Sequence, residues 1–123
     1  MKNLEIVAIV NAYQKGTSLK LPAAVAWKRR VNIDKLFKAK NLIDEALQEA
    51  REPYLDDEHS VPMENGGRQI LPEFVDAFAQ AQSEILTQET DIDIKKVKIE
   101  DIGDIEISDA DMDTLAFMIK DGD

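Results

Sequence analysis

The chain has 123 residues, a formal net charge of −10 and no cysteine. Its length fits one domain with a single core, and the missing cysteine excludes disulfides, thiolate nucleophiles and cysteine-ligated zinc. No stretch is apolar enough for a signal peptide or a membrane span. We therefore expect one domain, residues 1–123, in a cytoplasm.

The charge is distributed unevenly along the sequence. Residues 1–55 carry ten Lys/Arg and six Asp/Glu, whereas residues 56–123 carry five Lys/Arg and nineteen Asp/Glu. Most of the positive excess lies in the block Lys20–Lys40. Such a split bounds which surfaces can attract acidic or basic partners.

Two helices are predicted in the N-terminal half. Apolar residues at helical spacing predict a short helix from Lys2 to Lys15, which the run Gly16-Thr17-Ser18 ends. A second helix of about thirty residues starts at Pro22, because proline is favoured in a first turn, and is weakened at Pro53. Its apolar stripe, into which the stems of Arg29 and Lys40 fit, consists of Ala26, Ile33, Leu36, Phe37, Ile43, Leu47, Ala50 and Tyr54.

A turn signal and a third helix follow. Asn65-Gly66-Gly67 lies between two short apolar runs and predicts a hairpin or an ordered loop over Val61–Leu71. Pro72 then opens a helix that ends near Glu89 and packs on the long helix.

The last third changes from period two to helical spacing. Alternating apolar residues between Thr90 and Ile107 predict two short strands or extended segments. Ser108 with Asp111 resembles a capping box for a last helix, whose predicted buried face consists of Met112, Leu115, Ala116 and Ile119. Together the elements predict a mainly helical α+β domain, in which a long central helix carries shorter helices and a small β element.

No catalytic, cofactor-binding or metal-binding pattern stands out. Asp109–Asp113 alternates like the start of a calcium loop, but Thr114 replaces the required glycine and Lys120 the required glutamate. His59, the single histidine, has no serine motif beside it for a triad. We therefore predict no catalytic residue, no metal or cofactor site, and no enzyme activity.

The predicted interaction residues lie at the start of the long helix. They are Trp27, Lys28, Arg29 and Arg30, because tryptophan and arginine are enriched among binding hot spots. Basic residues at helical spacing can also follow a nucleic-acid backbone, yet the net charge of −10 repels one. Direct nucleic-acid binding is therefore not expected, and a solvated helix face is the simpler interpretation of the whole block.

Several runs in the chain share a layout with known small proteins. The runs are Leu19-Lys20-Leu21-Pro22-Ala23, Ala50-Arg51-Glu52-Pro53-Tyr54, and the tail from Asp104-Ile105-Glu106-Ile107-Ser108 to Met118-Ile119. With the short apolar first helix, this layout resembles phage and prophage proteins of bacteria that are classed as domains of unknown function. The resemblance implies expression in an infected bacterial cytoplasm and work by protein contact.

Three hypotheses for function follow. The leading one is a non-enzymatic phage or prophage protein that acts by protein–protein contact, with a homodimer among its candidate assemblies. The second is an acidic nucleic-acid mimic that inhibits a host nuclease or DNA-binding protein, with affinity that falls with salt. The third is a small enzyme that uses carboxylates with a metal ion.

Overall fold

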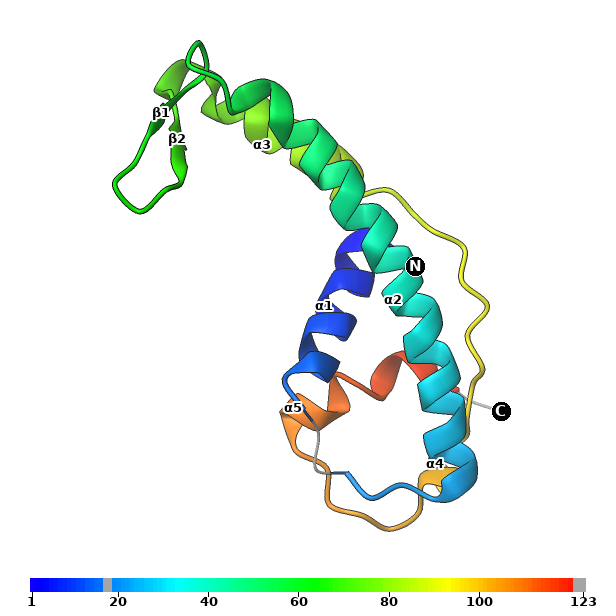
Figure 1. The fold of residues 1–123 in the computed structure, drawn as a ribbon. Helices are drawn as coiled ribbons and strands as arrows, with labels where there is room; N and C mark the ends of the chain where they lie inside the picture. Colours follow the sequence, from blue (N-terminus) through cyan, green and yellow to red (C-terminus); the bar gives the residue numbers. More distant parts are fainter. Residues whose placement is uncertain (17–18, 121–123) are drawn as a thin grey trace.

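The computed structural model describes residues 1–16 and 19–120 and confirms the mainly helical α+β fold (Figure 1). A long central helix carries shorter elements along its length. The helices are α1 (Asn3–Gln14), α2 (Ala23–Arg51), α3 (Val75–Leu86), α4 (Ile99–Ile102) and α5 (Asp109–Met112), with 3₁₀ turns at Glu52–Tyr54, Pro72–Phe74 and Ala116–Met118. The strands are β1 (Ser60–Pro62) and β2 (Arg68–Ile70).

Elements from both the N-terminal and the C-terminal part of the chain pack against the N-terminal half of α2, which is at the lower end of the helix in Figure 1. Its apolar residues recur at spacings of three, four and seven, which places them on one side of the helix. One core cluster joins α1 to α2 through the buried side chains of Ile6, Val10, Ile33, Leu36, Ile43 and Leu47. A second joins the start of α2 to the last third of the chain through Val25, Val97, Ile102, Leu115 and Met118.

The predicted stripe of the long helix is confirmed at four of its residues, Ile33, Leu36, Ile43 and Leu47. Ala26 is exposed, whereas Val25 beside it is buried. The first helix ends as predicted, with Gly16 at a φ of 95°, a left-handed conformation that favours glycine. Thr17 and Ser18, the rest of that stop signal, lie outside the described residues.

A buried asparagine of α2 holds the extended segment 89–98 against this helix. Asn32 is fully buried, and its side-chain amide donates to the Lys95 carbonyl oxygen at 2.9 Å and accepts from the Lys95 amide at 2.8 Å. The segment is extended, as predicted, and forms isolated bridges at Glu89 and Val97. Ile99, which the sequence placed in an extended segment, instead begins α4.

The C-terminal end of α2 and α3 form an antiparallel pair that ends in the hairpin (Figure 1). We call residues 41–90 the arm and the remaining residues the body. In the hairpin, β1 and β2 are antiparallel, with Val61 opposite Gln69. The predicted hairpin and third helix are confirmed, although α3 ends at Leu86 and has no fully buried residue.

The predicted last helix is present as two short pieces, α5 and the 3₁₀ turn Ala116–Met118. Its cap is confirmed, because the Ser108 hydroxyl accepts from the Asp111 amide at 3.2 Å. Its predicted buried face is confirmed at Leu115, whereas Ala116 is exposed and Thr114 and Met118, which were not predicted, are buried. Among the described residues, no helix combines the length and the apolar character needed to cross a membrane.

Candidate interaction surface

One side of α2 stays exposed over the whole helix. This side, opposite the core, we call the outer face. Its exposed members recur every three or four residues and are Trp27, Arg30, Asp34, Lys38, Asn41, Leu42, Glu45, Gln48 and Glu49. At about 1.5 Å per residue, the 29 residues of α2 make this face about 43 Å long.

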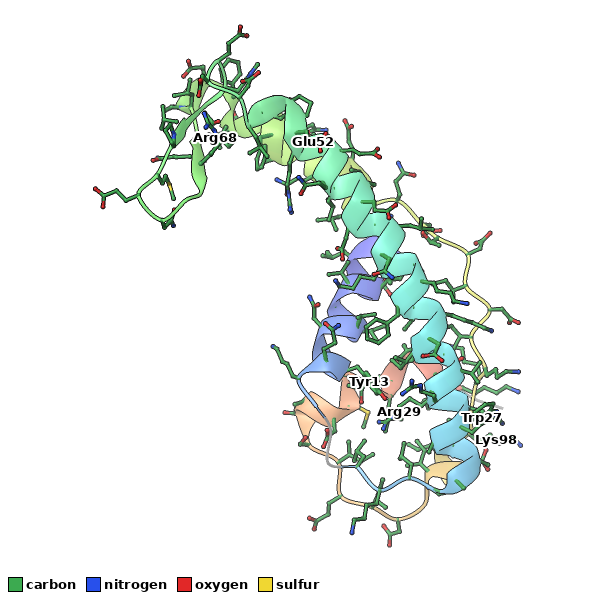
Figure 2. All side chains as sticks on the ribbon, viewed as in Figure 1. Tyr13, Trp27, Arg29, Glu52, Arg68 and Lys98 are labelled. Carbon is green, nitrogen blue, oxygen red and sulfur yellow. The ribbon has the colours of Figure 1, made fainter. Side chains whose placement is uncertain are left out.

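Trp27 is the most unusual residue of the outer face (Figure 2). Its side chain is 66% exposed, although Val25 and Arg29, two positions away on either side, are buried. Tryptophan is normally well buried, and when exposed it is enriched at binding interfaces. Packing within this chain therefore does not account for Trp27.

The four predicted interaction residues separate in the structure. Trp27 and Arg30 are exposed, Lys28 is half-buried, and Arg29 is buried. Arg30 Nε lies 3.3 Å from Asp34 Oδ1, one turn along the same face.

Arg29 has to be removed from the predicted interaction surface. Its guanidinium lies 5.6 Å from the centre of the Tyr13 ring, and Nη1 donates a long hydrogen bond of 3.5 Å to Thr114 Oγ1. The side chain thus connects α1, α2 and the C-terminal segment. It reaches the interior through its apolar stem, as its position on the apolar stripe predicts.

Sequence reasoning missed the lysines of the 95–98 segment. Asn32 holds Lys95 against α2, and Val97 packs in the same cluster as Val25, which brings this segment to the start of α2. These lysines come from the acidic part of the sequence, so charge counting along the chain could not find them. The usable signal was Asn32, since a buried amide on an apolar stripe needs a polar partner.

The charge of α2 changes sign along its length. The part in the body, residues 23–40, carries Lys28, Arg30 and Lys38 with Asp34 as its single acid, and the outer face of the part in the arm carries Glu45 and Glu49. A helix macrodipole favours the opposite arrangement, with anions at the N-terminus and cations at the C-terminus. No acidic residue occupies the first turn of α2, although Arg51 in the last turn has the favourable sign. The charge order is therefore unfavourable for the helix alone.

The fold collects the net charge of the protein on the arm. Residues 41–90 contain twelve Asp/Glu and two Lys/Arg, a net charge of −10, whereas all other residues contain thirteen of each. The acidic C-terminal part of the sequence is thus divided in space. The body is neutral when Asp121 and Asp123, which lie outside the described residues, are counted with it. The charged feature of the molecule is the arm.

An apolar groove of about 490 Å³ opens beside the outer face, between α2 and the segment Thr90–Asp93. Leu42 belongs to both features, since it lines the groove and is 68% exposed. Most of the exposed surface of the groove is apolar. The aliphatic residues Ala39, Leu42, Ile43, Ala46, Ile85 and Ile92 line it together with polar residues that include Lys35, Lys38, Asp91 and Asp93.

Asp56, Glu58 and His59 come together at the base of the hairpin, with one ligand-type atom of each within 4.8 Å of the others. Contacts inside the arm already use this histidine. Its Nδ1 lies 2.6 Å from Asp56 Oδ1, and its ring centre lies 4.5 Å from that of Phe74 and 5.7 Å from that of Tyr54. The His59 side chain is the main cause that lowers the pKa of Asp56.

The hydrogen bond between Asp56 and His59 gives the cluster a structural role. A cation bound through His59 Nδ1 would have to displace that bond.

No protein-family model, curated protein or solved structure matches this chain.

Proposed function

We propose that this chain is a non-enzymatic protein that acts by protein–protein contact, with the outer face of α2 as its contact surface. The observation that supports this most is Trp27, exposed on a helix face that also presents Arg30 and Leu42. Large exposed apolar side chains beside arginine are typical of interface hot spots. The phage or prophage setting is a further proposal that rests on the layout of the sequence.

The charge of the outer face favours a protein over a nucleic acid as its partner. A nucleic-acid backbone that follows the cations at the start of α2 would meet Glu45 and Glu49 farther along the same face. Both glutamates belong to the arm, which carries the whole net charge of −10. Phosphates would be repelled there, whereas a protein surface can present charges of both signs.

The test compares the proteins that two variants and the wild type retain from a lysate of the native host of this chain. Trp27→Ala with Arg30→Ala removes the anchor of the outer face. The matched control, Val61→Ala with Met63→Ala, removes exposed apolar side chains from the hairpin instead. We expect a protein that the wild type and the control retain and the outer-face variant loses. Identical retained sets for all three chains would contradict the proposal.

A second candidate function, an acidic nucleic-acid mimic, is favoured by the charge of the arm. The arm extends away from a neutral body and carries twelve acidic residues. Its only Lys/Arg residues are two arginines. A row of carboxylates can occupy a groove that normally binds phosphates, and such binding weakens steeply with salt.

Displacement of a fluorescent DNA duplex from a basic nucleoid protein tests the mimic. Neutralising Glu64, Asp76 and Glu84 as Gln, Asn and Gln should weaken displacement. Neutralising Glu5, Asp104 and Glu106 of the body in the same way should not, because these acids lie outside the arm. Equal loss in both variants, or no displacement by the wild type at low salt, would contradict this function.

A further inference from the structure

We propose that the outer face of α2 binds the same face of a second copy of this chain, with the two helices antiparallel. This inference rests on the proposed function, since it names the partner of that surface. Trp27 of each copy would enter the apolar groove of the other. The result is a closed, two-fold symmetric pair in which every contact occurs twice.

The first argument is charge complementarity. The part of α2 in the body presents Arg30 and Lys38 on the outer face and Lys28 beside it, with Asp34 as the one acid, and the part in the arm presents Glu45 and Glu49. A face with this order is self-complementary only when two copies run in opposite directions. Parallel copies would place cations on cations and anions on anions, which costs several kcal/mol at a buried interface.

The second argument is that the chain leaves these glutamates without partners. Among the described residues, the ion pairs join Arg30 to Asp34, Lys40 to Asp44, His59 to Asp56, and Arg68 to Asp57. None of these involves Glu45 or Glu49, and the neighbouring helix α3 contains no Lys or Arg. A second copy supplies both the missing cations and an opposed macrodipole, which together relieve the unfavourable charge order of α2.

The third argument is that the anchor and the groove have matching positions. We place the two-fold axis between residues 36 and 37. A residue of one copy then lies level with the residue of the other copy whose number brings the total to 73. Trp27 then reaches the groove, which Leu42 and Ala46 line. This register places Trp27 level with Ala46 and Lys28 with Glu45 of the second copy, while Lys38 lies level with Lys35 next to the axis.

Reversing the charges tests this pairing directly. One variant reverses the cationic half (Lys28→Glu with Arg30→Glu), a second reverses the anionic half (Glu45→Lys with Glu49→Lys), and a third combines all four changes. Each half-variant places like charges opposite each other in the pair, and the combined variant restores opposite charges. The reversed charges agree with the macrodipole, so α2 should remain folded in all three.

Light scattering after size exclusion, at tens of micromolar, measures the outcome. We expect the wild type and the combined variant at twice the 13.8 kDa chain mass. Each half-variant should run as a monomer, with a dimer Kd raised on the order of tenfold or more. Circular dichroism confirms that each variant keeps its helices.

Two results would overturn the pairing. One is a wild-type chain that stays monomeric, and the other is a pair of half-variants that dimerise as well as the wild type. A monomeric wild type whose Trp27→Ala, Arg30→Ala variant still loses a captured protein refutes the second copy and leaves the proposed function standing. A monomeric wild type that captures the same proteins as the Trp27→Ala, Arg30→Ala variant refutes both the pairing and the proposed function.

Discussion

Arg29 and Arg30 are consecutive in the sequence and lie in opposite environments. Arg29 is buried over the Tyr13 ring and reaches Thr114, whereas Arg30 is exposed and pairs with Asp34 on the outer face. Neighbouring positions of a helix differ by about 100° in direction, so one arginine can serve the core and the next a surface. Arg29 therefore contributes to the stability of the fold, whereas Arg30 is available for binding.

Alanine substitutions at these two positions should have different effects on stability. Arg29→Ala removes a buried stem and a cation over an aromatic ring, which should lower the free energy of unfolding by about 1–3 kcal/mol. Arg30→Ala breaks an exposed ion pair, and such pairs contribute at most about 1 kcal/mol, so a change of about 0.5 kcal/mol or less is expected. Urea unfolding followed by circular dichroism measures both. Equal losses would show that Arg29 is not part of the core.

At the scale of single elements, α1 and α3 form a natural comparison. Each has 12 residues and packs on α2. The first buries Asn3, Ile6 and Val10, and the second has no fully buried residue. Helices gain most of their stability from packing an apolar face, so the arm should open more readily than the body.

Amide hydrogen exchange can show this difference. We expect the amides of Val75–Leu86 to exchange faster than those of Asn3–Gln14 at the same pH and temperature. Measurement at low protein concentration keeps the chain monomeric, so that any partner of the arm does not protect it. Equal protection of the two helices would mean that the arm is as stable as the body.

The base of the hairpin should respond to acid. Ionised Asp56 is favoured in the folded state because the His59 side chain bonds to it, which lowers the pKa of Asp56 below its ordinary value of 3.8. Its stabilising contribution is therefore complete above that value and is lost as the pH falls through the lowered pKa. Asp56→Asn should accordingly lower the Tm near neutral pH and have no effect in strong acid.

Thermal melts of the wild type and Asp56→Asn across this pH range test the prediction. Asp104→Asn is the control, since this exposed acid lies in the body. A Tm difference for Asp56→Asn that stays constant from neutral pH into strong acid would contradict the assigned role of the pair.

Sequence reasoning succeeds for long elements and fails for short ones. Regular apolar spacing predicted α1, α2 and α3, and Asn65-Gly66-Gly67 predicted the hairpin, because these signals are local. By contrast, α4 has four residues and forms where the Asp101 carboxylate accepts from the Lys98 amide at 3.2 Å. Such a turn depends on its surroundings more than on periodicity.

The candidate surface was predicted in part. Trp27 and Arg30 were identified from residue type, but Arg29 required knowledge of Tyr13 and Thr114, which are distant in the sequence. The position of the 95–98 segment beside α2 depends on the hydrogen bond between Asn32 and Lys95, which are 63 residues apart in the sequence. Long-range contacts of this kind leave no local pattern.

For the whole molecule, the fold changes the meaning of the charge distribution. A basic first half and an acidic second half become a neutral body and an arm with the entire charge of −10 (Figure 1). The exception is α2, which belongs to both parts and whose outer face changes from cationic to anionic between them. The proposed antiparallel pairing sets the cationic part of each outer face against the anionic part of the other.

Trp27 offers the most direct measurement of this account, because it is the single tryptophan of the chain. Its emission reports one side chain, which is exposed in the single copy and enclosed in the pair. We predict that the emission maximum moves to longer wavelength, and that quenching by acrylamide increases, as the protein is diluted from tens of micromolar to tens of nanomolar. The variant with Lys28→Glu and Arg30→Glu should show the exposed emission throughout. Wild-type emission typical of exposed tryptophan at every concentration would contradict the account.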